Sequence, residues 1–232
     1  MTVQQSPSPD KPETTAKALA IEANFDDITK AAFKYRQRRV YRRLRKRGIH
    51  VILLSGKKAI RRKVAAIAQD EITLLTGVGH GRENAFCGYE NEPIFRVGRY
   101  EPLEVRGKVV HLLSCFVADG LGHDFRAKGC RAFFGYTEEF AVPFQDLDEL
   151  DELAEAFFGS DAEIDLAFAE GVPLDQILGR VQRKFDENVA RLNALGKREA
   201  AAVLESNRDL LIGLLAESER LSFTPFEPSR LV

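Results

Sequence analysis

The sequence contains no tryptophan, one methionine and three cysteines, and these scarcities narrow the kinds of protein it can encode. Three cysteines are too few, and odd in number, for a disulfide framework. No apolar run is long enough to span a membrane, and the N-terminus lacks the basic and apolar regions of a signal peptide. The formal net charge of −1 does not favour a nucleic-acid or membrane partner. We therefore expect a cytoplasmic protein with free thiols.

The composition predicts one main domain with additions at both ends. The chain has 232 residues, of which 44% are hydrophobic, enough for one sizeable core. The first residues are rich in Ser, Pro, Gln and Thr, which cannot form a core, and the pattern from Ala16 to Arg47 is helical. The expected regions are a flexible tail at 1–14, an N-terminal basic helical segment at 15–48, an α/β core at 49–145 and a helical C-terminal region at 146–232 packed on the core.

Short apolar runs predict a sheet of about four strands in the core. The expected strands are IHVILLS (49–55), EITLLTGV (71–78), VVHLLSC (109–115) and CRAFFGYTEE (130–139). Helical patterns at 57–69 and 120–129 lie between strands, and an edge hairpin is expected around 94–105. Strands that alternate with helices favour a mostly parallel sheet sandwiched by helices. The remaining sequence, from Asp146, is expected to be helical throughout.

Charge is distributed unevenly along the chain. The stretch from Lys34 to Gly48 contains nine Lys and Arg residues, whereas 132–179 contains thirteen acidic residues and no Lys or Arg. The basic helix could bind an anionic partner such as nucleic acid. Alternatively, it could be a solvated helix that docks against the acidic helices of its own chain. We favour the second interpretation, because the segment has few aromatic side chains for base stacking.

Two reactive side chains, His80 and Cys115, are expected at the ends of neighbouring strands. Ligands bind beyond the carboxyl ends of strands in open parallel sheets. An imidazole beside a thiol can remove its proton, which makes the sulfur nucleophilic. Gly79 and Gly81 allow a sharp turn, and the N–H groups of Gly81 and Cys115 could stabilise an oxyanion. The hypothesis is that Cys115 attacks a peptide carbonyl, His80 protonates the leaving amine, and water hydrolyses the thioester.

The other cysteines and histidines have simpler interpretations. Cys87 and Cys130 are expected to be small buried residues, and His50 and His123 to be surface residues. His111 lies on the same strand as Cys115, so a metal site is conceivable, but the sequence lacks the ligand spacings of a zinc site. No G-x-S-x-G elbow is present for serine hydrolase chemistry. We therefore expect no metal and no cofactor.

The order of these motifs resembles a known family. A strand ending in GHG, then LLSC, then GCRAFFGY resembles the caspase-like cysteine peptidases, and especially the gingipain, clostripain and CHAT-domain branch. The resemblance covers roughly residues 49–142. It implies a caspase-like fold, a catalytic dyad of His80 and Cys115, and a protein substrate. The Q-A-C-x-G signature of animal caspases is absent, so aspartate specificity is not implied.

The resemblance also suggests a biological setting, because bacterial relatives often act as regulated proteases in defence or cell death and cleave one partner protein. Residues at strand ends are expected to shape the substrate pocket, and a carboxylate there would select a basic residue. The candidates are Ser55, Asp119, Tyr136 and Glu138. Two other functions stay open. One is a catalytically inactive scaffold or interaction module with the same fold, and the other is a nucleic-acid-binding protein that uses residues 34–48.

Overall fold

The structure, a computed structural model, describes residues 16–143 and 152–220 of the chain, so the expected tail at 1–14 lies outside the described residues. The strands are β1 (Lys17–Glu22), β2 (His50–Ser55), β3 (Leu74–Val78), β4 (His80–Arg82), β5 (Ala85–Cys87), β6 (Pro93–Arg96), β7 (Val109–Leu113), β8 (Ala132–Tyr136) and β9 (Leu211–Leu215). The α-helices are α1 (Asp27–Arg36), α2 (Arg42–Lys46), α3 (Arg61–Ala68), α4 (His123–Ala127), α5 (Glu152–Ala169), α6 (Leu174–Ala194), α7 (Arg198–Leu210) and α8 (Glu217–Arg220). Two π-helical segments, η1 (Gln37–Tyr41) and η5 (Ala118–Gly122), and three short 3-10 turns, η2 (Gly56–Lys58), η3 (Tyr89–Asn91) and η4 (Pro102–Glu104), complete these elements.

The main sheet has six strands in the order β2-β1-β3-β7-β8-β9. The pairings from β2 to β8 are parallel, and only β9 runs antiparallel to its neighbour. Val78 of β3 is level with Leu113 of β7, so the carboxyl ends of these two neighbouring strands coincide. This mixed α/β sheet between helices confirms the expected fold class.

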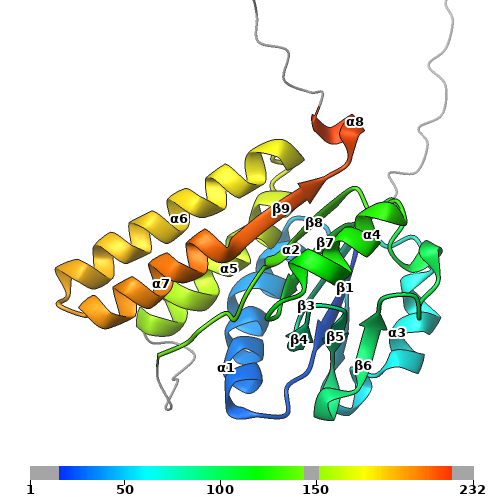
Figure 1. Ribbon diagram of the computed structural model, residues 1–232, viewed down its shortest axis with the longest axis horizontal. Coiled ribbons are helices and arrows are strands. Elements are labelled where there is room, and N and C mark those ends of the chain that lie inside the picture. The colour runs from blue at the N-terminus through cyan, green and yellow to red at the C-terminus, as the bar shows by residue number, and fades with distance from the viewer. Residues whose placement is uncertain (1–15, 144–151, 221–232) are drawn as a thin grey trace, which may run out of the picture.

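Helices cover both faces of the sheet (Figure 1). Alternate side chains of each strand point to opposite faces, as strand geometry requires. Leu74 and Val109 join one core together with side chains of α1, α5 and α6, whereas Leu75 and Val110 join a second core with side chains of α3 and α4. Helices α6 and α7 extend the first layer beyond α5 (Figure 1). The sheet is therefore held rigidly from both sides.

The prediction of a continuous helix from Ala16 was wrong, because Lys17–Glu22 is a strand inside the sheet. Alanine is a strong helix former, which gave KALAIE a helical pattern. All residues from Ala18 to Glu22 are fully buried, as expected for a strand that parallel neighbours flank on both edges. The true helix α1 begins after this strand, where the side chain of Asp26 caps its N-terminus.

The C-terminal region is also not helical throughout. Residues Leu211–Leu215 leave the helical path after α7 and pair with β8 as an antiparallel edge strand. The stretch LIGLL continues the leucine-rich pattern of the preceding helix, so local sequence does not mark the change. The expectation of about four strands was wrong for the same two reasons, since β1 and β9 bring the sheet to six.

The edge hairpin expected around 94–105 was placed incorrectly. β6 pairs with β5, which precedes it in the chain, and β5 pairs with β4 to give a three-stranded antiparallel sheet. His80 is the first residue of this small sheet. The helices expected at 57–69 and 120–129 are confirmed as α3 and α4.

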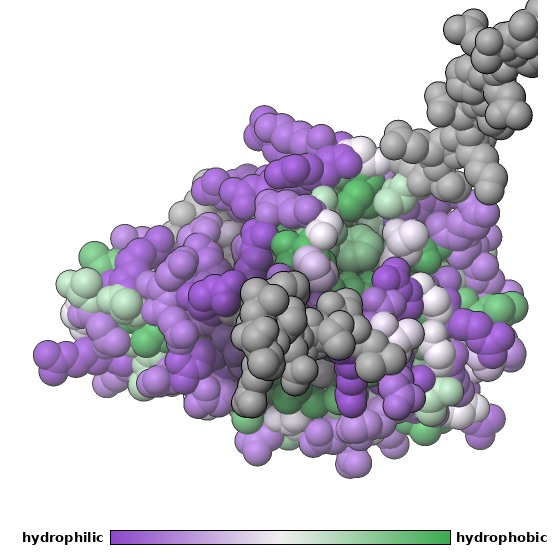
Figure 2. Space-filling view, turned by 90° about the horizontal axis from the view of Figure 1, so that it is seen from above, coloured by the Kyte–Doolittle hydropathy of each residue, from purple (hydrophilic) through white to green (hydrophobic). Residues whose placement is uncertain are grey.

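The described surface is mainly hydrophilic, with smaller hydrophobic patches on the face seen in Figure 2. Five large hydrophobic side chains are exposed in the described ranges, and two of them, Ile28 and Phe116, lie beside the site described next. Within residues 16–143 and 152–220, no helix combines the length and the apolar character that crossing a membrane requires.

Candidate active site

His80 and Cys115 meet at one cavity at the carboxyl edge of the sheet. Each lies two residues beyond the paired ends of β3 and β7, and both line a cavity of about 110 Å³. The His80 side chain is 45% exposed, and Cys115 is half-buried. The sheet therefore brings together the two residues that the sequence predicts as a dyad.

Gly81 fits tightly against the residue that carries the thiol. A Cβ atom added at position 81 would lie 2.1 Å from the carbonyl oxygen of Cys115 and 2.3 Å from the Oγ of Ser114. No side chain fits at such distances, so glycine is required here for close approach of two backbones. The GHG and LLSC motifs are thus in direct contact, although 34 sequence positions separate Gly81 from Cys115.

A third residue, Asp26, contacts the histidine. Oδ2 of Asp26 lies 2.8 Å from Nε2 of His80, while Oδ1 accepts a hydrogen bond from the N–H of Thr29 at the start of α1. Both carboxylate oxygens of Asp26 therefore accept hydrogen bonds. The ring of Phe25 packs edge-on against the imidazole of His80, with 5.7 Å between the ring centroids. Burial opposes ionisation of Asp26, but its hydrogen bonds to Thr29 and His80 hold the pKa below the usual value. The imidazole is fixed from two sides.

The role of Asp26 was not predicted from the sequence, because this residue follows the strand that was interpreted as helix. An available signal was the Asp26-x-x-Thr29 spacing, which is typical of a helix N-cap. A cap at this position ends the preceding element before the helix. Recognising it would have shown that Asp26 follows a strand, at the same sheet edge as His80.

The Cys115 thiol has an environment that favours its neutral form. Burial raises its pKa, and the Glu139 carboxylate raises it further, whereas the backbone N–H groups of Phe140 and of Cys115 itself act in the opposite direction. Thiolate formation therefore needs a base, and His80 is the candidate in the same cavity. The next residue, Phe116, has a positive φ of 62°, which is unusual for a bulky side chain, and its N–H donates to the Glu138 carbonyl at 3.0 Å.

The rest of the cavity wall is largely apolar. Among the residues that the structure describes, the polar contributors besides the dyad are Thr29, Ser114 and Glu139. Ser114 is 2% exposed and, within the described part of the chain, its Oγ has no hydrogen-bond partner. The apolar side chains come from α1, β3, β7, α5 and the segment after β8, and they are Ile28, Ala32, Val78, Leu113, Phe140 and Phe158.

The structure does not bring the expected substrate-binding residues into this cavity. Ser55 accepts a hydrogen bond from Asn24, and Asp119 and Glu138 are exposed; none of these three lines the cavity. Tyr136 is a core residue, because it is fully buried and its hydroxyl donates to Asp161 at 3.0 Å. Strand position predicted the right edge of the sheet, but the backbone path after each strand decides which side chains reach the cavity. Glu139 reaches it in place of Glu138.

His111 belongs to a separate group of polar side chains, the buried charge cluster, which lies between the sheet and helices α1 and α5. Its members are Glu22, Arg36, Tyr41, Thr76, His111, Tyr136, Asp161 and Asp165, all fully buried. In the described residues, no group of three or more His, Cys, Asp or Glu side chains could hold a metal ion. The cluster was not expected from the sequence.

Within the buried charge cluster, His111 is held between two aspartates of α5. Its Nδ1 lies 3.1 Å from Asp165 and its Nε2 lies 3.1 Å from Asp161. Burial disfavours the imidazolium, but the two carboxylates raise the pKa of His111 to about 9. Burial also raises the pKa of Glu22 to about 7, although Arg36 counteracts part of this effect. The cluster therefore balances its charges through ionised Asp, Arg and His groups.

A π-helical turn in the basic segment directs two side chains into this cluster. Arg36 directly precedes η1 and Tyr41 is its last residue, so the two are five positions apart, and both contact Glu22. A π-turn realigns residues that an α-helix would separate around its axis. Arg36 also forms an ion pair with Asp165 at 2.9 Å. Docking of the basic segment against an acidic helix of the same chain is thus confirmed for Arg36.

Other basic residues of the segment face solvent. Arg47 lies 3.8 Å from Glu170 of the C-terminal region. The exposed basic side chains of η1 and α2 include Arg39, Arg42, Arg43, Arg45 and Lys46. Nucleic-acid binding by this surface stays a prediction.

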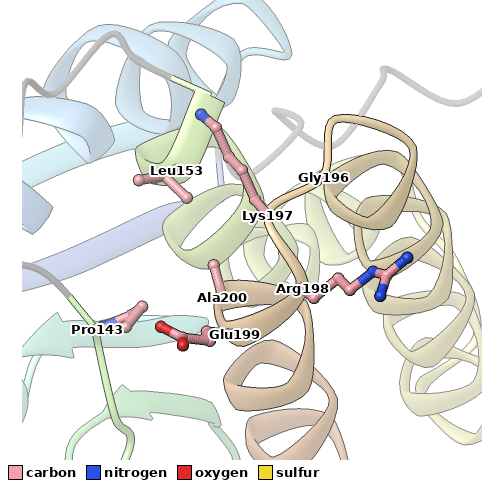
Figure 3. Close-up of a pocket in the computed structure, with 7 residues that line it drawn as sticks. All are labelled: Pro143, Leu153, Gly196, Lys197, Arg198, Glu199 and Ala200. Atoms are coloured by element: carbon pink, nitrogen blue, oxygen red, sulfur yellow. The ribbon is translucent and has the colours of Figure 1, made fainter.

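The remaining cysteines and histidines are placed as expected. Cys87 and Cys130 are buried and not disulfide-bonded, and His50 and His123 are exposed. A second hollow, of about 500 Å³, lies at the start of α7 near Leu153 (Figure 3). The described residues that line it include no His or Cys, and Lys197 there pairs with Glu152 at 3.2 Å. The cavity at Cys115 is therefore the candidate active site.

Comparison with known proteins supports the fold class. No known protein family and no curated protein matches the sequence. Among solved structures, the chain is similar to the Arg-specific cysteine proteinase gingipain R, with a TM-score of 0.51 and 15% sequence identity. The match covers 82% of this chain but only 44% of the gingipain chain. The chain thus has a caspase-like α/β fold, and the likeness at this identity concerns the fold alone.

Proposed function

We propose that the protein is a cysteine peptidase that hydrolyses a peptide bond through a thioester on Cys115, with His80 as general acid and base. The observation that carries this proposal is that both residues line one cavity while the backbone of Gly81 contacts that of Cys115. A histidine or a cysteine alone at the end of a strand would not indicate catalysis. Together, they supply a nucleophile, a base and a site for the reacting carbonyl.

The reaction begins when His80 accepts the proton of the Cys115 thiol. The thiolate attacks the substrate carbonyl carbon, and the N–H groups of Gly81 and Cys115 stabilise the resulting oxyanion. His80 then gives its proton to the leaving amine as the C–N bond breaks, which leaves a thioester on the sulfur. Water attacks the thioester with His80 again accepting a proton, and this step releases the carboxylic acid product and the free thiol.

Asp26 acts on this reaction through His80. Its carboxylate, 2.8 Å from Nε2, stabilises the imidazolium that forms in both steps and fixes the orientation of the ring. The opposite nitrogen, Nδ1, is then the atom that exchanges the proton with Cys115 and the leaving amine. Asp26 is therefore a positioning residue, and it also keeps α1 in place through its N-cap hydrogen bond.

The substrate of the proposed reaction is a protein or peptide. The arginine specificity of gingipain R is not carried over, because the likeness concerns the fold and the pocket of this chain is built from its own residues. Restriction to one partner protein, a cytoplasmic location and a role in defence or cell death are predictions from the family resemblance.

A peptide library tests the proposal. The wild-type protein and Cys115→Ala are incubated with a mixture of peptides that covers all residue types, and the cleaved bonds are identified by mass spectrometry. We expect wild type to cleave a subset of the peptides and Cys115→Ala to cleave none. A folded wild-type protein that cleaves nothing would instead favour the catalytically inactive scaffold.

A further inference from the structure

The cavity beside Cys115 has the position of a pocket for the substrate side chain next to the cleaved bond. We infer that it binds the side chain of the residue before the scissile bond, and that this side chain is a small aliphatic one, of the size of valine or leucine. This inference rests on the proposed function, since it assigns the residue whose carbonyl Cys115 attacks.

The position of the lining residues supports this assignment. Cys115 and His80 lie at the accessible end, because His80 is 45% exposed and Ile28 beside it is 46% exposed. The inner wall consists of Ala32, Val78, Leu113 and Phe158, which are at most 4% exposed. A carbonyl held at the sulfur would therefore have its side chain directed between α1 and α5, into the first core.

The chemistry of the inner wall excludes a charged occupant. Ala32, Val78, Leu113 and Phe158 offer no hydrogen-bonding group to a guanidinium, an ammonium or a carboxylate. Burial of an unpaired charge is strongly unfavourable even after relaxation of the protein. Within residues 16–143 and 152–220, Glu139 is the one acidic side chain that lines the cavity, and it is exposed, so it lies at the rim and not at the inner wall.

The polar side chains of the wall do not alter this chemistry. The hydroxyl of Thr29 donates to the Asp26 carbonyl at 3.3 Å and accepts from the Phe25 N–H at 3.2 Å. Its hydrogen bonds are therefore made with backbone groups at the start of α1. The Oγ of Ser114 lies at the reactive end, because it would be 2.3 Å from a Cβ at Gly81. That oxygen is buried against the backbone of Gly81, so it is not part of the inner wall that would contact the substrate side chain.

The size of the cavity sets the upper limit of the occupant. Its volume is about 110 Å³. An apolar protein cavity of about 150 Å³ accepts benzene, so a pocket of this size takes a branched chain of three or four carbons but not a phenyl or indole ring. Phe116, 42% exposed and next to Cys115, and Ile28 add apolar surface at the entrance. Both features favour an aliphatic residue.

The test compares short fluorogenic peptides that differ only in the residue before the scissile bond: Ala, Val, Leu, Phe, Arg or Asp. We expect kcat/KM for Val or Leu to exceed that for Phe, Arg and Asp by about tenfold or more. In parallel, binding of the same peptides to Cys115→Ala is measured by fluorescence anisotropy, which requires no catalysis. The aliphatic peptides are expected to bind more tightly there as well.

Two variants connect the preference to the cavity. Ala32→Val narrows the inner wall and is expected to shift the preference from Leu towards Ala. A substitution at the buried Ala32 can affect folding, so a second variant, Ile28→Ser, changes the exposed entrance instead. It should lower kcat/KM for the Val and Leu peptides by a few-fold, the effect expected from the loss of one or two methylene contacts. Leu195→Ser, at an equally exposed residue that does not line the cavity, is the control.

The outcomes separate this inference from the proposed function. Cleavage that prefers Arg, Asp or Phe would overturn the inference and leave the peptidase proposal intact. Absence of cleavage together with tighter binding of aliphatic peptides to Cys115→Ala would overturn the peptidase proposal and support the pocket. Absence of both cleavage and selective binding would overturn both.

Discussion

Gly81 approaches Cys115 so closely that a Cβ on Gly81 would lie 2.1 Å from the Cys115 carbonyl oxygen. This contact joins the segment that carries the candidate base to the segment that carries the candidate nucleophile. It also fixes the relative position of the two N–H groups that we assign to the oxyanion. The geometry of the site therefore depends on one residue without a side chain.

Gly81→Ala should consequently reduce peptidase activity strongly. The added methyl must push the two backbones apart, and a displacement of about 1 Å costs on the order of a hundredfold in rate. The measurement is kcat/KM together with thermal unfolding. Gly179→Ala in α6 is the control, because its nearest atom, at 3.8 Å, is the end of the flexible Arg183 side chain. Activity of Gly81→Ala within twofold of wild type would contradict the assigned geometry.

Asp26→Asn should lower kcat/KM by about tenfold to a hundredfold, in the range of acid–base effects. Asparagine caps helices as well as aspartate does, so the variant removes the charge at His80 but retains the cap. Asp26→Ser is a second variant that retains capping and loses the contact with the imidazole. We expect both variants to unfold at similar temperatures and to show an altered pH profile of kcat/KM. An unchanged pH profile would show that Asp26 acts only as the N-cap of α1 and has no effect on His80.

The alkylation rate of Cys115 should continue to increase with pH after the thiol of a free cysteine is fully ionised. Burial and Glu139 raise its pKa, so the thiolate fraction at neutral pH is small in the absence of substrate. Glu139→Gln removes the nearby negative charge and should accelerate labelling by iodoacetamide at neutral pH by about twofold to threefold, a modest effect because Glu139 is exposed. Glu138→Gln serves as the control, since Glu138 does not line the cavity. Equal rates in all three proteins would contradict the stated cause.

The buried charge cluster should make the fold less stable in alkaline solution. The pKa of His111 is raised from 6.5 to about 9, so its contribution is complete below pH 6.5 and is lost as pH rises through 9. The shift corresponds to on the order of 3 kcal/mol. Glu22, raised from 4.5 to about 7, acts in the same direction at lower pH, because its contribution is lost as pH rises through 7. Stability should therefore decrease with rising pH.

Denaturant unfolding between pH 6 and pH 10 tests this decrease. His111→Gln should be less stable at pH 7 by about 3–5 kcal/mol, since it leaves Arg36 as the one cation of the cluster against Asp161 and Asp165. The variant should also lose most of the alkaline decrease. His123→Gln, at an exposed histidine, should retain the wild-type pH dependence. A wild-type stability that stays constant or rises from pH 6.5 to 9.5 would show that His111 is not held as an imidazolium.

Much of the fold could be predicted because its central strands are strongly apolar. The patterns LLTGV and VVHLL fix two parallel strands, and the residues after them, His80 and Cys115, then meet at one edge. The strand Lys17–Glu22 was missed because its alanines also suit a helix. With it, the position of Asp26 was missed. The strand Leu211–Leu215 depends on pairing with β8, which local sequence does not report.

The buried charge cluster shows a second limit of sequence patterns. Asp161 and Asp165 lie four positions apart in α5, which places both on one helix face. That spacing was an available sign of a buried cation. The partners Arg36 and His111 lie on other elements, however, and only the packing of α1 and α5 against the sheet brings all four together.

The most direct test of the account is to capture the intermediate. Wild-type protein and His80→Ala are mixed with a cleavable peptide ester, quenched in acid within milliseconds to seconds, and digested for mass spectrometry. We expect an acyl group on Cys115 in wild type, none on Cys87 or Cys130, and little or none in His80→Ala. Peptide cleavage by wild type without an acyl adduct on Cys115, or cleavage that persists in Cys115→Ala, would contradict the account.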